Sequence, residues 1–321
     1  MMKNMSQITS RIGPPLIALI LAVILFFSGG LIRSGFVSYA QAINIVRLAS
    51  FLGIIAAGQT IVIISGGEGI DLSVGAVVTL SAILVYRYSD GQNLLILPAL
   101  LLALAVGAGV GSLNGLGIAF LGIPPLIMTL AMAGVVEGLI LIVTQGQFIG
   151  DVPPAMTAYI SNPLVFRMPG VIFLWMLLAL GMWLLLERTA FGKHLFAIGV
   201  NRTTARLSGV GVDLTVILAY ALSGMLAAFG GFTVLAFAQN VFLRLGDRYL
   251  FPSIAAVVVG GTILAGGKGS YFGTISGALV LTLITSLLTA MQLPEAYRQI
   301  ILGATLLVLI SVYGRQRALR E

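Results

Sequence analysis

Long runs of apolar residues recur along almost the whole chain, and they restrict its fold more than any other feature. A helix rises 1.5 Å per residue, so roughly 20 apolar residues cross the ~30 Å hydrocarbon core of a membrane. The pattern predicts an all-α membrane protein, a polytopic helical bundle of about ten spans, some of them short or broken. We place the spans at 14–32, 42–64, 71–87, 94–118, 124–144, 169–187, 214–238, 251–265, 271–291 and 297–313.

Composition supports a membrane protein and excludes several other classes. Hydrophobic residues make up 59% of the 321 residues and charged residues only 8%, whereas soluble domains carry about 25% charged residues. Cysteine is absent, so disulfides, zinc–thiolate sites and thiol nucleophiles are excluded. The net charge of +7 is typical of basic loops on the cytoplasmic side of a membrane, and we predict contact with lipid and not with nucleic acid.

The two ends of the chain bear on its orientation. Lys3 and Arg11 precede the first apolar run, and the small residues at 40–42 resemble a signal-peptidase site that lies too far beyond that run. We therefore predict a retained signal-anchor helix. Ten spans place both termini on one side, and the more basic set of loops favours the cytoplasm for the tails 1–13 and 314–321. Residues 14–313 then form a single transmembrane domain.

Residues 188–213 are polar in an otherwise apolar chain, and we expect them to form a cytoplasmic loop. Asn201 can cap a short helix over Arg202 to Ser208, and Gly209 and Gly211 can end it in left-handed conformations. So short a helix is unstable alone. The residues by themselves leave two interpretations open: docking into a groove on a soluble partner, or a solvated basic loop at the membrane interface.

Residues 61–80, IVIISGGEGIDLSVGAVVTL, place two acids between two spans. The surrounding glycines permit a break in the helix, and Asp71 can cap the next helix by accepting bonds from the amides near Ser73 and Val74. The alternatives are a tight capped turn and a direct role of Glu68 and Asp71 in substrate binding or gating.

A similar glycine-rich segment surrounds Lys268 at 260–279. It lacks the Walker spacing of glycine, four residues and then Gly-Lys-Ser/Thr, so this chain is not expected to hydrolyse ATP. A tight turn between helices is the simpler interpretation.

Polar side chains within the apolar runs are candidates for a solute pathway. Glu137 is the one acid that we place well within a span, and ionisable groups there are costly and often functional. Each of these groups has an alternative role as a hydrogen-bond partner of another helix, and Glu137 has a position near the outer surface as a further alternative. The pathway or gating candidates are Gln59, Glu68, Asp71, Asn114, Thr129, Glu137 and Gln239.

Enzyme chemistry finds little support in the sequence. The chain has one histidine, no metal-binding spacing and no pair of carboxylates in one span. We predict no catalytic residue, no metal site and no cofactor bound by this chain.

Four blocks together resemble a known family: GIDLSVGA at 69–76, NGLGIAFLGIPPLIMTLAM at 114–132, FGKHLFAIGVNRTTARLSGV at 191–210 and IAAVVVGGTILAGGKGSYFGTISGAL at 254–279. They are similar to the permease subunits of ribose-type sugar ABC importers, over about residues 40–312.

The resemblance implies a function and a set of partners. The expected partners are a second permease copy or a paralogue, cytoplasmic ATPase subunits that hold ATP and Mg, and a periplasmic sugar-binding protein. It also implies that the cytoplasmic loop carries a coupling helix that contacts the ATPase, which favours partner docking over a bare loop. Carried onto this sequence, that helix includes Asn201, Arg202, Thr203, Thr204, Ala205, Arg206, Leu207, Ser208 and Gly209.

The resemblance leaves the solute open. Glu68 and Gly69 separate the glycine pair from Ile-Asp-Leu-Ser, and Glu137 stands where many relatives have a basic or neutral residue. The alternatives to a monosaccharide importer are an importer of nucleosides or branched-chain amino acids, and an ion-coupled transporter that uses Glu137 and Asp71.

Overall fold

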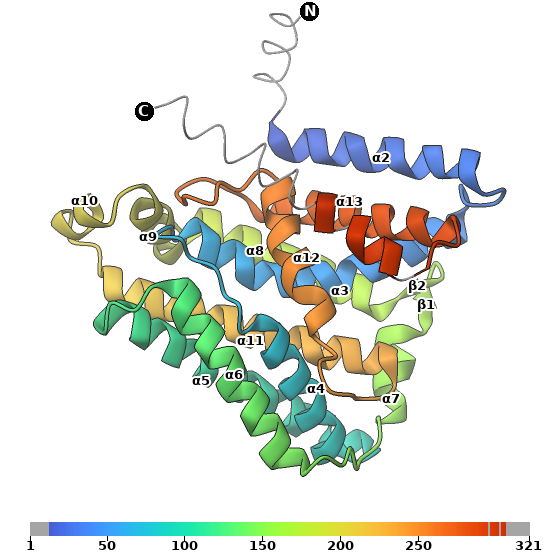
Figure 1. Cartoon of the computed structure of the whole chain (residues 1–321), viewed down its shortest axis with the longest axis horizontal. Helices are drawn as coiled ribbons and strands as arrows, with labels where there is room; N and C mark the ends of the chain where they lie inside the picture. Colours follow the sequence, from blue (N-terminus) through green and yellow to red (C-terminus); the bar gives the residue numbers. More distant parts are fainter. Residues whose placement is uncertain (1–12, 295, 302, 306–321) are drawn as a thin grey trace, which may run out of the picture.

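The structure is a helical bundle whose long helices run side by side (Figure 1). It is a computed structural model and describes residues 13–294, 296–301 and 303–305. Within these residues seven helices are long and apolar enough to cross a membrane. They are α2 (Pro14–Ile32), α3 (Tyr39–Ile64), α5 (Ile96–Phe120, preceded by the 3-10 turn η1, Asn93–Leu95), α6 (Pro125–Thr144), α8 (Gly170–Arg188), α11 (Val212–Ala238) and α13 (Tyr271–Ala290).

Shorter elements connect the long helices. Two of them, at Val74–Ser89 and Ala190–Val200, are shorter apolar helices, and the small helix at Arg202–Leu207 projects from one end of the bundle (Figure 1). The shorter elements are α4 (Val74–Ser89), α7 (Pro154–Met156), the π-helical turn η2 (Thr157–Ser161), the antiparallel pair β1 (Pro163–Val165) and β2 (Met168–Pro169), α9 (Ala190–Val200), α10 (Arg202–Leu207) and α12 (Asp247–Val259).

Seven predicted spans are confirmed as helices, with ends within three residues of those expected. The predicted span 71–87 is the shorter helix α4. The prediction for 251–265 is wrong at both ends, because α12 covers 247–259 and glycines at 261, 266 and 267 take positive φ angles. The span 297–313 and both terminal tails lie wholly or partly outside the described residues, so the count of ten and the position of the termini stay predictions.

The core lies around α3 and α11. The second half of α3 is buried on every side, and α11 packs against α3, α4 and α5. A second group of contacts joins α13 to α2, α3 and α12. By contrast α2 lies along one edge beside α13, with most of its surface exposed (Figure 1).

Glycines allow α5 and α11 to pack backbone against backbone. Gly107, Gly111 and Gly115 recur every four residues, so they share one face of α5. A Cβ at Gly111 would overlap the carbonyl oxygen of Tyr220, and one at Gly115 would lie 2.5 Å from Cα of Ile217. Close approach of this kind is a main source of helix association in lipid, where apolar burial contributes little.

We expect Gly111→Ala to destabilise the detergent-purified protein by about 1–3 kcal/mol, because the added methyl overpacks the α5–α11 contact. Thermal unfolding measures the effect. Gly109→Ala on the same helix is the matched control, since a Cβ there meets nothing within 4 Å. Equal melting temperatures for the two variants would contradict the packing argument.

Candidate functional site

The link between α3 and α4 leaves the helical conformation although it is mostly buried. We call residues 65–73 the break. Gly66, Gly67 and Glu68 take φ angles of 69°, 64° and 60°, and the chain resumes as a helix at Val74. Backbone groups in such a segment need partners within the protein, because lipid offers none.

Asp71 is the centre of a buried hydrogen-bond network in the break. Its Oδ1 accepts from the backbone N–H of Ser73 at 3.0 Å and from the Ser73 hydroxyl at 2.6 Å. Its Oδ2 accepts from the hydroxyl of Ser223 on α11 at 2.8 Å. The Asp71 side chain is fully buried. The predicted bond to the Ser73 amide is confirmed, but the N-cap of α4 is Ser73 and not Asp71. The bond to α11 adds a long-range contact.

Three further helices hold the break through polar side chains. Gln59 on α3 donates to the Asp71 carbonyl at 2.6 Å and accepts from the Asp71 amide at 3.3 Å. Asn114 on α5 donates to the Ser73 hydroxyl at 3.0 Å. Thr129 on α6 accepts from the amide of Leu72 at 3.0 Å. The break is therefore bound by side chains from α3, α5, α6 and α11.

Four of the seven pathway candidates meet in the buried network, and the other three have exposed side chains outside it. Gln59, Asp71, Asn114 and Thr129 meet at the break and are fully buried, so their contact with a solute stays a prediction. Glu68 is exposed on the break, Glu137 is exposed on α6, and Gln239 is exposed as the C-cap of α11.

One residue of the network and one residue near it escaped the sequence analysis. Ser223 supplies the link to α11, and Tyr220, one turn earlier, has a buried hydroxyl without a hydrogen-bond partner among the described residues. A serine within an apolar helix is a weak signal, because most such hydroxyls bond to their own helix.

The polar segment 188–213 forms two helices in place of one. The first, α9, is capped by the Thr189 hydroxyl, which accepts from the Gly192 amide at 3.2 Å, and the sequence analysis did not predict it. The second, α10, is the predicted short helix. Asn201 caps it by accepting from the Thr204 amide at 2.9 Å. We call α9 and α10 together the coupling segment.

The end of α10 agrees with the prediction only in part. Gly209 has a φ of 82°, as expected for a left-handed stop. The expectation for Gly211 is wrong, because its φ is −70° and it serves as the N-cap of α11. There the Gly211 carbonyl accepts from both the amide and the hydroxyl of Thr215.

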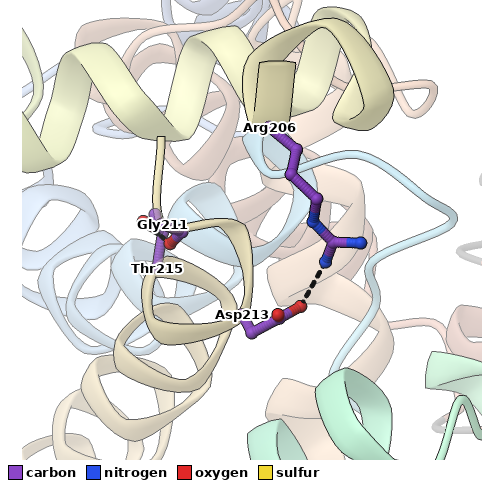
Figure 2. Close-up of polar contacts among 4 residues, drawn as sticks. All are labelled: Arg206, Gly211, Asp213 and Thr215. Carbon is purple, nitrogen blue, oxygen red and sulfur yellow. Dashed lines mark hydrogen bonds and ion pairs between the residues drawn. The ribbon is translucent and has the colours of Figure 1, made fainter. Parts of the chain in front are cut away.

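Side chains of α10 point in opposite directions. Arg206 reaches α11, where its Nη2 lies 2.7 Å from Oδ1 of Asp213 in an exposed ion pair (Figure 2). Leu207 is 85% exposed at the tip of the projecting helix. Ala205 is buried, and Arg202 is half-buried toward the break. Of the other predicted coupling residues, Asn201, Thr203, Thr204, Ser208 and Gly209 are exposed.

A family model and several named proteins each match this chain over most of its length. Residues 41–310 match a family described as the permease component of the branched-chain amino acid transport system. The autoinducer 2 import system permease protein LsrC of Yersinia enterocolitica is 34% identical over 95% of this chain and 83% of its own length. Proteins of the same name from Yersinia pestis and Yersinia pseudotuberculosis are 34% identical over 95% of this chain and 86% of theirs. No solved structure matches.

We expect Asp71→Ala to destabilise the protein by about 1–3 kcal/mol, because it leaves the buried hydroxyls of Ser73 and Ser223 and one amide without an acceptor. Glu68→Ala is the matched control: an exposed carboxyl in the same break, whose loss is expected to change stability by less than about 0.5 kcal/mol. Thermal unfolding in detergent compares them, and similar losses would contradict the role of the Asp71 network.

Proposed function

This chain belongs to the family of permease components described for branched-chain amino acid transport, and on that premise we propose that it imports a small, hydroxylated, sugar-like solute. It is a multi-pass protein of the bacterial inner membrane and a transport subunit of an ABC importer. It is not an enzyme, and ATP is hydrolysed by a separate ATPase. Membership of the family implies a partner ATPase and a periplasmic binding protein.

The observation that supports energy transfer from an ATPase is the projecting helix α10. A six-residue helix is unstable by itself, and this one is held by its Asn201 cap and by its contacts with α9 and α11. It presents Leu207, Thr203 and Thr204 to solvent. A partner that covers Leu207 removes apolar surface from water, which favours binding. We therefore place α10 in the cytoplasm, in a cleft of the ATPase.

The remaining partners complete the importer. A second copy of this chain or a paralogue would provide the other wall of the solute route. Two ATPase subunits would hold ATP and Mg. The periplasmic protein would deliver the solute at the opposite face. Closure of the ATPase pair would move the two α10 helices, and the permease pair would open alternately outward and inward.

The solute class rests on the named relatives. Three permeases that are 34% identical to this chain are named for the import of autoinducer 2, which favours a small hydroxylated solute. The description of the family favours branched-chain amino acids as the second candidate. An ion-coupled mechanism has no support from either comparison.

Glu137 is our candidate for contact with the solute. It lies on an exposed side of α6, one turn before the exposed Leu141. A carboxylate that faces lipid at the centre of a helix costs about 2.5–3.5 kcal/mol, so we place this one against the water-filled route. There it can accept hydrogen bonds from the hydroxyl groups of the solute.

The experiment that tests the function is co-purification with the ATPase and the binding protein of the same transport system. ATP hydrolysis by the reconstituted complex is then measured with autoinducer 2, ribose and leucine. Stimulation by autoinducer 2 or ribose supports the proposal, and stimulation by leucine alone supports the second candidate. A chain that recruits no ATPase contradicts the proposed function.

We expect Leu207→Asp to reduce the amount of bound ATPase about tenfold or more, because a charge replaces an exposed leucine whose burial against a partner contributes about 1.5–3 kcal/mol. The co-purified ratio of the two subunits measures it. Leu94→Asp is the matched control, since Leu94 is 88% exposed before the N-terminus of α5, at the opposite end of that helix from the coupling segment. Equal loss with both variants would argue against docking at α10.

We expect Glu137→Leu to reduce solute transport about tenfold or more while melting temperature and bound ATPase stay unchanged, because only the contact with the solute is lost. Transport into vesicles measures it. Leu139→Ala, an exposed change on the same helix, is the control. If Glu137→Leu stabilises the protein and transport is preserved, the side chain faces lipid.

A further inference from the structure

Arg202 is the one cation of α10 that is turned into the molecule. It is half-buried, whereas Arg206 is exposed and pairs with Asp213. Nη2 of Arg202 donates to the carbonyl oxygen of Gly66 at 3.3 Å. Part of the Arg202 side chain is therefore engaged within the permease itself.

The guanidinium of Arg202 lies directly over the backbone of the break. A Cβ at Gly67 would stand 2.6 Å from Nη2 and 2.7 Å from Cζ of Arg202. Gly67 has a φ of 64°, which an L side chain adopts only with strain. The absence of a side chain at Gly67 therefore makes room for the arginine.

A second contact joins the coupling segment to the same place. A Cβ at Gly199, near the end of α9, would overlap the carbonyl oxygen of Ile64 and the backbone nitrogen of Gly267. That nitrogen donates to the Ile64 carbonyl at 2.9 Å. The end of α3, the end of α9 and the loop before α13 thus meet backbone against backbone, and a displacement of α9 cannot leave the start of the break unchanged.

The far side of the break is bound to α5, α6 and α11. Asp71 is bonded to α11 through Ser223, and the neighbouring residues are bonded to α5 and α6 through Asn114 and Thr129. The break therefore connects the coupling segment with three helices of the bundle.

The same region holds hydrogen-bonding capacity that this arrangement does not use. Nε of Arg202, the hydroxyl of Tyr220 and Oδ1 of Asn114 are buried and have no hydrogen-bond partner among the described residues. Unpaired buried groups carry a cost that a different arrangement can recover. A shifted coupling segment can then form new bonds at the break as it loses the bond to Gly66.

We propose that Arg202 is a positioning residue for transport, whose guanidinium joins α10 to the break and transmits the movement of α10 to α5, α6 and α11. This inference rests on the proposed function, and it separates two roles within one short helix. Leu207 faces outward and binds the ATPase. Arg202 faces inward and connects the bound helix to the solute route.

Hydrogen exchange of the purified permease alone tests the link without any partner. Arg202→Ala is expected to speed exchange of the amides at 65–73 roughly three- to tenfold, the factor for loss of one hydrogen bond. Lys193→Ala and Arg206→Ala remove exposed cations of the same segment, of which Arg206 pairs with Asp213, and they are expected to leave this exchange unchanged. Equal exchange in Arg202→Ala and the parent protein would overturn the proposal.

Arg202→Lys is a second, milder variant that distinguishes a specific effect at the break from misfolding. Lysine keeps the charge but lacks the planar fork, so it cannot both cover Gly67 and donate to Gly66. We expect exchange between that of the parent protein and that of Arg202→Ala, with peptides of α11 unchanged in both variants. Faster exchange spread evenly over all helices would show a general loss of stability and would overturn a specific link.

Transport by the reconstituted complex provides the functional readout. Arg202→Ala is expected to keep its bound ATPase and to lower the solute transported per ATP by about fivefold or more, within the range measured for coupling residues. Loss of the ATPase subunit, as in Leu207→Asp, would place the guanidinium at the docking surface and overturn the proposal. If the parent chain recruits no ATPase, the proposed function fails, and hydrogen exchange still decides whether Arg202 controls the break.

Discussion

The structure depends on satisfying the polar backbone of residues 65–73 inside an apolar bundle. A helix satisfies its own amides and carbonyls, but the break cannot, and lipid offers no partners. Both carboxylate oxygens of Asp71 accept hydrogen bonds here. Oδ1 accepts from the backbone amide and the hydroxyl of Ser73, and Oδ2 accepts from the hydroxyl of Ser223 on α11. Gln59 adds bonds to both backbone groups of Asp71. Irregular backbone at this place is stable because several helices contribute to it at once.

Local signals in the sequence were sufficient for most of the fold. The apolar runs predicted seven helices, because the length of each run sets the length of the helix that it forms. The Asn201 cap and the Gly209 stop predicted α10 because both act within a few residues of the helix. The resemblance to permeases added the family, which the comparisons confirm. The predicted span 251–265, by contrast, extended over Gly260 and Gly261, because a helix end at 259 and the positive φ of Gly261 leave no trace in hydropathy.

Contacts between distant residues were the part that the sequence could not supply. Ser223 lies 152 residues from Asp71, and a hydroxyl in an apolar helix does not reveal its partner. The same limit applies to Arg202 and Arg206, which are four residues apart in one helix and identical in type. Only their contacts in the folded chain distinguish them, because Arg202 lies over Gly67 and Arg206 pairs with Asp213.

The edge position of α2 has a consequence for biosynthesis. This first apolar helix packs chiefly on α13, which begins about 240 residues after α2 ends. At 5–20 residues per second the ribosome needs roughly 12–48 seconds to make that interval. During this time α2 lies in the bilayer with lipid as its main neighbour, and its exposed leucines and isoleucines are compatible with a lipid environment. Its docking onto α13 is then among the last steps by which the newly made chain closes its bundle.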